Sequence, residues 1–269
     1  MFRVRQKVGV DVLQITDLTK KFSGTVALDA VTLTVAPGEM AAVIGRSGAG
    51  KSTFLRSINR LDSPTSGDIS FEDVNVGQLT GRALRKWRCG CAMIFQQFNL
   101  VDRMDVLSNV LIGRVSYHSQ LRSCLKLYNT RERALAIMAL DRVEMADFAL
   151  QRADTLSGGQ QQRVAIARAL VQEPRIVLAD EPIASLDPRS AMHVMRLLRD
   201  INCKDGITVL CSLHTLDMAR SYCDRIIGMR AGQVVFDGPA TDVDASTARN
   251  IYGTDDDSGA FGEPVPSAA

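Results

Sequence analysis

The first part of the chain is rich in β-branched residues that alternate in part with polar ones. Residues 10–18 and 26–35 follow this pattern, and they predict two strands before a turn at residues 36–38. Residues 40–44 then form a continuous apolar run, which is typical of a strand buried on both faces. A Gly-rich turn leads from this run into a predicted helix over residues 52–59. The N-terminal region is therefore expected to be β-rich and to end in a strand–turn–helix unit.

Helical spacing of apolar residues dominates the middle of the chain, between about residues 81 and 151. Beyond this segment, strands and helices alternate again. The predicted elements are helices over 160–171, 190–201 and 216–222, and strands over 176–179, 207–211, 225–229 and 233–236. Alternation of strand and helix favours a parallel sheet that is covered on both faces. We therefore predict an α/β protein in which a mainly helical insert of about 70 residues interrupts the sheet.

Composition and charge are those of a globular protein. The chain has 269 residues, of which 46% are hydrophobic and 23% charged, and its formal net charge is +2. These proportions exclude a collagen-like repeat and disfavour disorder. The six cysteines are too sparse for a disulfide framework, so we expect reduced thiols. No apolar stretch reaches the length of a membrane span, and residues 1–21 lack the core of a signal peptide, so a soluble intracellular protein is expected.

The last residues differ in composition from the rest. Residues 254–269 carry four acidic residues and no Lys or Arg, so this segment contributes −4 and the body of the chain +6. We predict a disordered acidic tail here and a single domain over residues 10–253. A moderately basic body suits a polyphosphate ligand. Because no basic cluster lies on a known reader motif, a nucleic-acid partner is not expected.

A phosphate-binding loop follows the buried strand. Residues 45–52 match the pattern G-x-x-x-x-G-K-[ST] at the junction of a strand and a helix. Glycines let the backbone wrap a phosphate with its N–H groups pointing inward, and the helix N-terminus adds partial positive charge. Lys51 would reach the β- and γ-phosphates, and the Ser52 hydroxyl would bind Mg²⁺. The predicted cofactor-binding residues here are Gly45, Arg46, Ser47, Gly48, Ala49, Gly50, Lys51, Ser52 and Thr53.

An apolar strand over residues 176–179 ends in two carboxylates, Asp180 and Glu181. Strands often end in an acidic residue, so this signal is weak alone and becomes strong only beside the phosphate loop. Asp180 is expected next to a nucleotide-bound metal ion. Glu181 points elsewhere and would orient or deprotonate an attacking water.

A second anion-binding segment is predicted at residues 156–163, Leu-Ser-Gly-Gly-Gln-Gln-Gln-Arg. Two glycines at a helix start direct backbone N–H groups toward an anion, and the Ser157 side chain adds a donor. A simple helix N-cap with flexible glycines would give the same local pattern. We interpret the segment as a second phosphate-binding surface, which follows the first loop by more than 100 residues.

These motifs resemble those of the ATP-binding subunits of ABC transporters, over about residues 10–240. Leu-Ser-Gly-Gly-Gln at residues 156–160 matches the signature of that family. The resemblance implies a P-loop NTPase fold with a mainly parallel core sheet, an N-terminal antiparallel β subdomain and a helical subdomain at about residues 97–160. It also implies a head-to-tail homodimer, in which the signature of one copy closes over ATP held by the loop of the other.

The resemblance also implies roles for single residues. Phe22 would stack on adenine, Gln96 would sense Mg²⁺ and the γ-phosphate, and His214 would contact the γ-phosphate. The implied cofactors are ATP and Mg²⁺. The implied catalytic residues are Glu181, His214, Lys51 and Gln96, the implied metal ligands are Ser52, Gln96 and Asp180, and the residues acting in trans are Ser157, Gly158, Gly159, Gln160 and Asp187.

Several stretches resemble the ATPases of phosphonate importers in particular, namely residues 95–101, 180–188, 198–202 and 205–209. The implied partners are two integral-membrane permease subunits and an extracytoplasmic phosphonate-binding protein. The implied location is the cytoplasmic face of the cell membrane, as a peripheral protein. No residue of an ATPase subunit touches the solute, so phosphite, phosphate or another oxyanion stays an alternative. A soluble ABC protein that acts as an assembly switch is a second one.

Two segments keep more than one interpretation. Residues 99–113 lie where the family receives the coupling helices of its membrane partner. Their apolar side chains would line that groove or form the core of the helical insert. A basic stretch over residues 114–133 is either a solvated helix face or a contact with the permease or with anionic headgroups.

Overall fold

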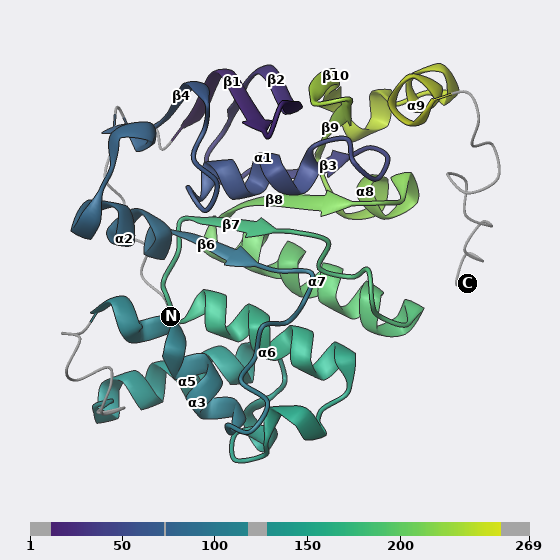
Figure 1. Cartoon of the computed structure of the whole chain (residues 1–269). Coiled ribbons are helices and arrows are strands. Elements are labelled where there is room, and N and C mark those ends of the chain that lie inside the picture. The colour runs from purple at the N-terminus through teal and green to yellow at the C-terminus, as the bar shows by residue number, and fades with distance from the viewer. Residues whose placement is uncertain (1–11, 73, 118–127, 254–269) are drawn as a thin grey trace.

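The computed structural model describes residues 12–72, 74–117 and 128–253 (Figure 1). The predicted acidic tail, residues 254–269, lies outside the described residues, as do Arg122 and Lys126 of the basic stretch.

A six-stranded sheet forms the centre of the molecule (Figure 1). Its strands lie in the order β10-β9-β3-β8-β7-β6, and all neighbours are parallel except β9 and β10. The strands are β3 (Met40–Ile44), β6 (Cys91–Ile94), β7 (Ile176–Ala179), β8 (Thr208–Leu213), β9 (Arg225–Arg230) and β10 (Gln233–Pro239). The predicted mainly parallel sheet is confirmed. Because parallel strands share one carboxyl edge, the loops that follow β3, β6, β7 and β8 meet there.

A second sheet packs beside the first and is antiparallel, in the order β2-β1-β4-β5. Its strands are β1 (Leu13–Phe22), β2 (Thr25–Val35), β4 (Ser66–Phe71) and β5 (Val74–Asn75). The predicted N-terminal antiparallel unit is therefore confirmed. It covers α1 from the side opposite the core sheet, as Figure 1 shows.

Helices lie on both faces of the core sheet. The α-helices are α1 (Lys51–Ile58), α2 (Gly81–Gly90), α3 (Val106–Leu111), α5 (Thr130–Arg142), α6 (Gly158–Leu170), α7 (Pro188–Asp205), α8 (Leu216–Tyr222) and α9 (Ala245–Tyr252). Short 3₁₀ turns are η1 (Val76–Gln78), η2 (Ile112–Tyr117), η3 (Ala146–Phe148), η4 (Ala153–Thr155) and η5 (Ala240–Asp242). Within the described ranges, no helix combines the length and apolar character that crossing a membrane demands.

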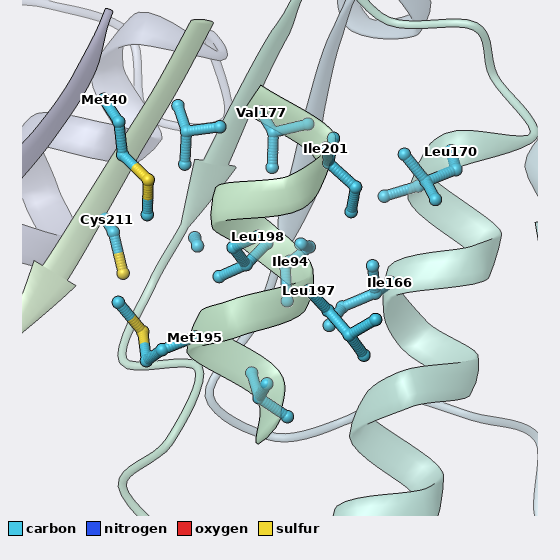
Figure 2. Packing of buried hydrophobic residues seen from close by; sticks show 14 of the residues in the cluster. Met40, Ile94, Ile166, Leu170, Val177, Met195, Leu197, Leu198, Ile201 and Cys211 are labelled. Atoms are coloured by element: carbon cyan, nitrogen blue, oxygen red, sulfur yellow. The ribbon is translucent and has the colours of Figure 1, made fainter. Parts of the chain in front are cut away.

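Two hydrophobic clusters fill the two faces of the core sheet, because side chains alternate along each strand. On one face, Leu210 of β8 packs in a cluster with Phe54 of α1. On the other face, Cys211 packs in a cluster with α6 and α7. Figure 2 shows this second cluster, with Leu197 and Leu198 of α7 among residues of the strands and of α6. The sheet therefore separates α1 from α6.

The segment expected to be mainly helical contains a strand of the core sheet. Residues 91–94, which form β6, pair in parallel with β7 and are almost wholly buried. Four apolar residues in a row fit one turn of a buried helix as well as they fit a strand, so periodicity cannot separate the two. The mainly helical part begins after this strand, where α3, α5 and α6 pack against one another.

The structure resolves part of the ambiguity in residues 99–117. Val106 is fully buried in the core, whereas Val101 is 46% exposed. Arg114 belongs to the basic stretch that the sequence assigns either to a solvated helix face or to a contact with the permease or anionic headgroups. It is instead buried, and it donates to Glu173 Oε2 at 2.9 Å and to the Val171 carbonyl oxygen. A buried guanidinium needs such partners, so Arg114 ties η2 to the end of α6.

Cys89, Cys91, Cys203, Cys211 and Cys223 are free thiols, whereas Cys124 lies outside the described residues. Burial raises the pKa of Cys91 and of Cys211, and it raises the pKa of Cys223 to about 12. Because the thiolate is the reactive form, these three buried cysteines are inert components of the core.

Candidate functional site

The phosphate loop lies between β3 and α1, as the sequence predicts. The tip of the loop, residues 46–48, is exposed, and the loop ends at Gly50, which has φ of 103°. A Cβ atom at Gly50 would also lie 2.6 Å from the Ala27 carbonyl oxygen. Only glycine fits this left-handed conformation against β2 without strain. The tight turn directs the start of α1 toward the carboxyl edge of the sheet.

Lys51 is the first residue of α1, and it is 4% exposed. Its Nζ donates to the carbonyl oxygens of Gly45 at 2.7 Å and Arg46 at 3.1 Å. Burial lowers the pKa of Lys51, and the nearby carboxylates of Glu181 and Asp180 oppose that shift. The ammonium group is therefore held inside the loop, where a phosphate would offer it a stronger acceptor than these two neutral carbonyls.

Ser52 and Asp180 meet at the carboxyl edge of the sheet. Ser52 Oγ donates to Asp180 Oδ1 at 2.8 Å, and Asp180 is 8% exposed. The backbone N–H of Asp180 donates to the Ile94 carbonyl oxygen at 2.8 Å, which joins the ends of β7 and β6. Gln96, two residues beyond Ile94, is exposed at the same edge. Hydroxyl, carboxylate and amide oxygens are the hard ligands that Mg²⁺ prefers, so these residues fit a magnesium ion.

Glu181 and His214 form a direct contact. His214 Nε2 lies 2.7 Å from Glu181 Oε1, and the two side chains are 45% and 13% exposed. The backbone of Glu181 is in the left-handed region, with φ of 47°. Tyr252 Oη of α9 donates to the His214 carbonyl oxygen at 3.1 Å. The structure thus brings together the residue predicted to act on the attacking water and the residue that the resemblance assigns to the γ-phosphate.

The signature segment begins α6 with a capping box. Ser157 Oγ accepts from the Gln160 N–H at 3.3 Å, and Gln160 Oε1 accepts from the Ser157 N–H at 2.8 Å. The helix cap and the anion site that the sequence leaves as alternatives are compatible here. Ser157 uses its oxygen as an acceptor, so its hydroxyl hydrogen stays available to a ligand, as do the N–H groups of Gly158 and Gly159 at the start of α6.

Gly159 marks a close approach between α6 and α7. A Cβ atom here would lie 2.6 Å from Ser190 Oγ and 2.8 Å from Ser190 Cβ. A shallow cavity of about 190 Å³ opens beside this contact, with Arg163, Arg189 and His193 on its wall. The cavity is lined by Ser157, Gly159, Gln160, Arg163, Arg189, Ser190 and His193. The signature therefore lies in a basic recess of its own.

Asp187 caps the start of α7. Its carboxylate accepts from the N–H groups of Arg189 and Ser190, both at 3.1 Å. Hydrogen bonds from the side chain and backbone of Ser190 lower the pKa of Asp187. The side chain is exposed, so the residue predicted to cross a dimer interface is ionised and holds the helix next to the signature.

Phe22 lies at the end of a strand of the antiparallel sheet, whereas the signature lies apart from the residues around Lys51. Phe22 ends β1, is 43% exposed and has Lys20 Nζ 4.6 Å from its ring centroid. The ring is therefore exposed at the end of the strand, with Lys20 over one of its faces. The signature begins α6, which lies across the core sheet from α1 (Figure 1). The phosphate loop and the signature of one chain therefore lie on opposite sides of the core sheet.

Two residues at the site were not found from the sequence. Ser212 Oγ, in β8, donates to Asp180 Oδ1 at 3.0 Å. Tyr252 supports the backbone of His214, as described above. For Ser212 a signal was present, since it is the polar residue in the otherwise apolar end of β8, Val-Leu-Cys-Ser-Leu. Tyr252 has no comparable signal, because only the folded chain brings α9 near β8.

A strand, a Gly-rich turn and a helix, with the Asp180 carboxylate from the end of β7 beside them, define a P-loop nucleoside triphosphatase. The family model described as ABC transporter matches residues 28–184. The chain belongs to this family and is one of its ATPase subunits.

Relatives and solved structures agree with that assignment. The chain is 57% identical to the phosphonates import ATP-binding protein PhnC of Rhizobium etli, with 95% of this chain and 91% of that protein covered. It is 55% identical to the protein of the same name from Agrobacterium fabrum, with 94% and 88% covered. The ATP-binding cassette MJ0796, in a dimeric post-hydrolysis state bound to ADP and Pi, is similar with a TM-score of 0.74 and 35% identity, over 85% of this chain and 98% of that one.

Proposed function

We propose that this chain is the ATP-hydrolysing subunit of an ABC importer and couples ATP binding and hydrolysis to the uptake of phosphonates. The observation that carries the substrate class is near full-length similarity, above half identity, to proteins named for phosphonate import. The contact between Glu181 and His214, next to the bond between Ser52 and Asp180, supports hydrolysis. We assign residues 10–253 to one ATPase domain with its helical part at about 97–160.

The phosphate loop and its neighbours would bind the nucleotide and position it. Backbone N–H groups of residues 45–53 would surround the phosphates, and Lys51 would exchange its two carbonyl partners for phosphate oxygens. Ser52, Asp180 and Gln96 would hold Mg²⁺. When bound, this ion neutralises charge on the β- and γ-phosphates.

Glu181 and His214 would prepare the attacking water. Glu181 Oε1 is an ionisable acceptor at the carboxyl edge of the sheet, so it would orient the water and accept its proton. The imidazole of His214 contacts the Glu181 carboxylate in the structure described here, and it would form a hydrogen bond with the γ-phosphate when ATP is present. Developing charge would then meet donors that are already in place, which is the main source of catalysis in such sites.

The remaining donors would come from a second copy of the chain. Ser157, Gly158, Gly159 and Gln160 lie across the core sheet from Lys51, so we propose that they complete the site of the partner copy. Asp187, next to them at the start of α7, would link the two sites. A solved relative that is dimeric with ADP and Pi bound supports this arrangement.

Mixing two defective variants tests the shared site. Ser157→Asp keeps a good helix cap but adds negative charge where a phosphate would dock, and Lys51→Ala disables the loop. We expect each variant alone to lose ATP hydrolysis. A co-expressed pair with two affinity tags should regain activity, because one intact composite site forms in the mixed dimer. Phosphate release by the doubly purified dimer measures this.

A control variant and one contrary outcome separate a shared site from a signature that acts on its own chain. Ser157→Asn keeps both the cap and neutrality, so it should retain most of the activity and controls for local damage. A mixed dimer that is as inactive as its two parents would mean that the signature acts on its own chain.

Phe22 provides a smaller, local prediction. Replacing Phe22 by Ala should weaken ATP binding by roughly 3- to 10-fold, since a stacked aromatic pair contributes about 0.5–1.5 kcal/mol. Phe22→Trp should preserve the affinity, and binding of inorganic triphosphate should be indifferent to both changes. Fluorescence titration with ATP measures the dissociation constant. Equal affinities of Phe22→Ala and the wild type would remove Phe22 from the adenine site.

An importer also needs proteins other than this chain. We propose that the dimer binds two integral-membrane permease subunits at the cytoplasmic face of the cell membrane, and that an extracytoplasmic phosphonate-binding protein delivers the solute. Val101, exposed beside the start of α3, lies in the segment that would receive the permease. Co-purification with the permease in detergent tests this. An ATPase that never co-purifies, and whose activity ignores the permease, would point to the soluble assembly switch.

A further inference from the structure

Ser212 is a buried hydroxyl in a strand that otherwise buries apolar side chains. It is 0% exposed and pairs with Val43 across β8 and β3, the two strands at the middle of the core sheet. Leu210, two residues earlier, packs with α1, so alternation places Ser212 on the same face as Ser52. An apolar residue would fill this position without the cost of burying a hydroxyl.

The Ser212 hydroxyl bonds both acidic residues that end β7. Its Oγ donates to Asp180 Oδ1 at 3.0 Å and accepts from the backbone N–H of Glu181 at 2.8 Å. Asp180 Oδ1 also accepts from Ser52 Oγ at 2.8 Å. A hydroxyl has one hydrogen to donate. The Ser212 hydroxyl gives it to Asp180, so it serves Glu181 as an acceptor.

The second of these bonds acts on a strained backbone. Glu181 has φ of 47°, a conformation that costs a residue with a Cβ atom free energy unless its surroundings hold it. The bond from the Glu181 N–H to Ser212 Oγ fixes this peptide, and the contact with His214 holds the other end of the residue. Loss of the hydroxyl would release the turn and leave the Glu181 N–H without this acceptor.

We propose that Ser212 is a positioning residue that sets the Asp180 carboxylate and the Glu181 backbone together, so that the metal side and the water side of the site are aligned. This rests on the proposed function of both acidic residues. Simple satisfaction of a buried hydroxyl is the alternative. However, Ser57 of α1 is also fully buried and its Oγ has no hydrogen-bond partner, so the fold tolerates a buried serine without a bond.

The variant Ser212→Ala should lower kcat for ATP hydrolysis by about 10- to 100-fold, which is the range for losing a hydrogen bond to a charged group. The dissociation constant for ATP without Mg²⁺ should change by less than about threefold, because the phosphate loop and Phe22 are untouched. The Mg²⁺ concentration that gives half-maximal nucleotide binding should rise several-fold. Ser212→Thr keeps the hydroxyl and should recover most of the lost rate.

Ser57→Ala is the matched control, because it also removes a buried hydroxyl and should leave turnover and Mg²⁺ dependence as in the wild type. A Ser212→Ala protein that turns over as fast as Ser57→Ala would overturn the positioning role, as would a folded Ser212→Thr that is as slow as Ser212→Ala. Crystal structures add a readout that needs no activity. Glu181 should leave the left-handed region in Ser212→Ala, and an unchanged φ would contradict the inference.

The two proposals fail in different ways. A wild type that does not hydrolyse ATP would contradict the proposed function, whereas the crystal structures would still decide what Ser212 positions. A wild type that hydrolyses ATP alongside an equally active Ser212→Ala would contradict only the positioning role.

Discussion

Replacing Glu181 by Gln should leave a protein that binds ATP and forms dimers but hydrolyses ATP at least about 100-fold more slowly, the loss expected when a group acting in the transition state is removed. The amide has the shape of the carboxylate, so the Gln side chain should still reach His214, whose Nε2 lies 2.7 Å from Glu181 Oε1. An amide cannot accept the proton of the attacking water. Binding should therefore survive while the chemical step is lost.

Phosphate release, ATP titration and light scattering with and without ATP measure the three properties separately. Glu144→Gln is the matched control, since Glu144 forms a surface ion pair with Arg163 at 3.6 Å and is 67% exposed. Its turnover should equal that of the wild type. Near-normal turnover by Glu181→Gln would remove Glu181 from its proposed role.

Replacing Lys51 by Ala should abolish ATP hydrolysis and weaken ATP binding, with a fall in kcat/KM of about 100-fold or more. The ammonium group is buried in the loop and donates to two carbonyl oxygens, so phosphate oxygens would gain a strong, preformed donor. Arg should not replace it, because a planar guanidinium is larger and differs in geometry from a compact ammonium. ATP titration and phosphate release give the two parts of the effect.

A surface lysine provides the control for charge. Lys204 of α7 pairs with Asp200 one turn away and is 68% exposed, so Lys204→Ala should change neither parameter. A Lys51→Ala protein that binds and hydrolyses ATP within about threefold of the wild type would contradict the phosphate-binding role of the loop, since even one lost donor commonly costs more.

Features encoded by contiguous residues could be predicted from the sequence. The apolar run at residues 40–44, the Gly-rich turn and Lys51 lie within 12 consecutive positions, and this strand–turn–helix unit is the same in the structure. The alternation of strands and helices after residue 158 likewise predicts the parallel sheet, because it reports local burial along each element.

Features that depend on contacts between distant segments could not be predicted in the same way. The strand at residues 91–94 is too short to show a period, and its pairing with β7 defines it. Arginine is usually a surface residue. Arg114, however, is enclosed by the end of α6 and donates a hydrogen bond to Glu173. Ser212 acquires its partners only when β7 and β8 lie side by side, which brings residues about 30 positions apart into one hydrogen-bond network.

If ATP hydrolysis by this chain drives phosphonate import, hydrolysis by the reconstituted complex should depend on the solute that is offered. The dimer, its permease and the phosphonate-binding protein would be placed in liposomes, and phosphate release would be followed against a panel of phosphonates, phosphite and phosphate. We predict that phosphonates stimulate hydrolysis several-fold when the binding protein is present. Complexes carrying Glu181→Gln should show no such stimulation of phosphate release. Hydrolysis that does not respond to phosphonates, or that responds only to phosphite or phosphate, would show that this chain does not drive phosphonate import.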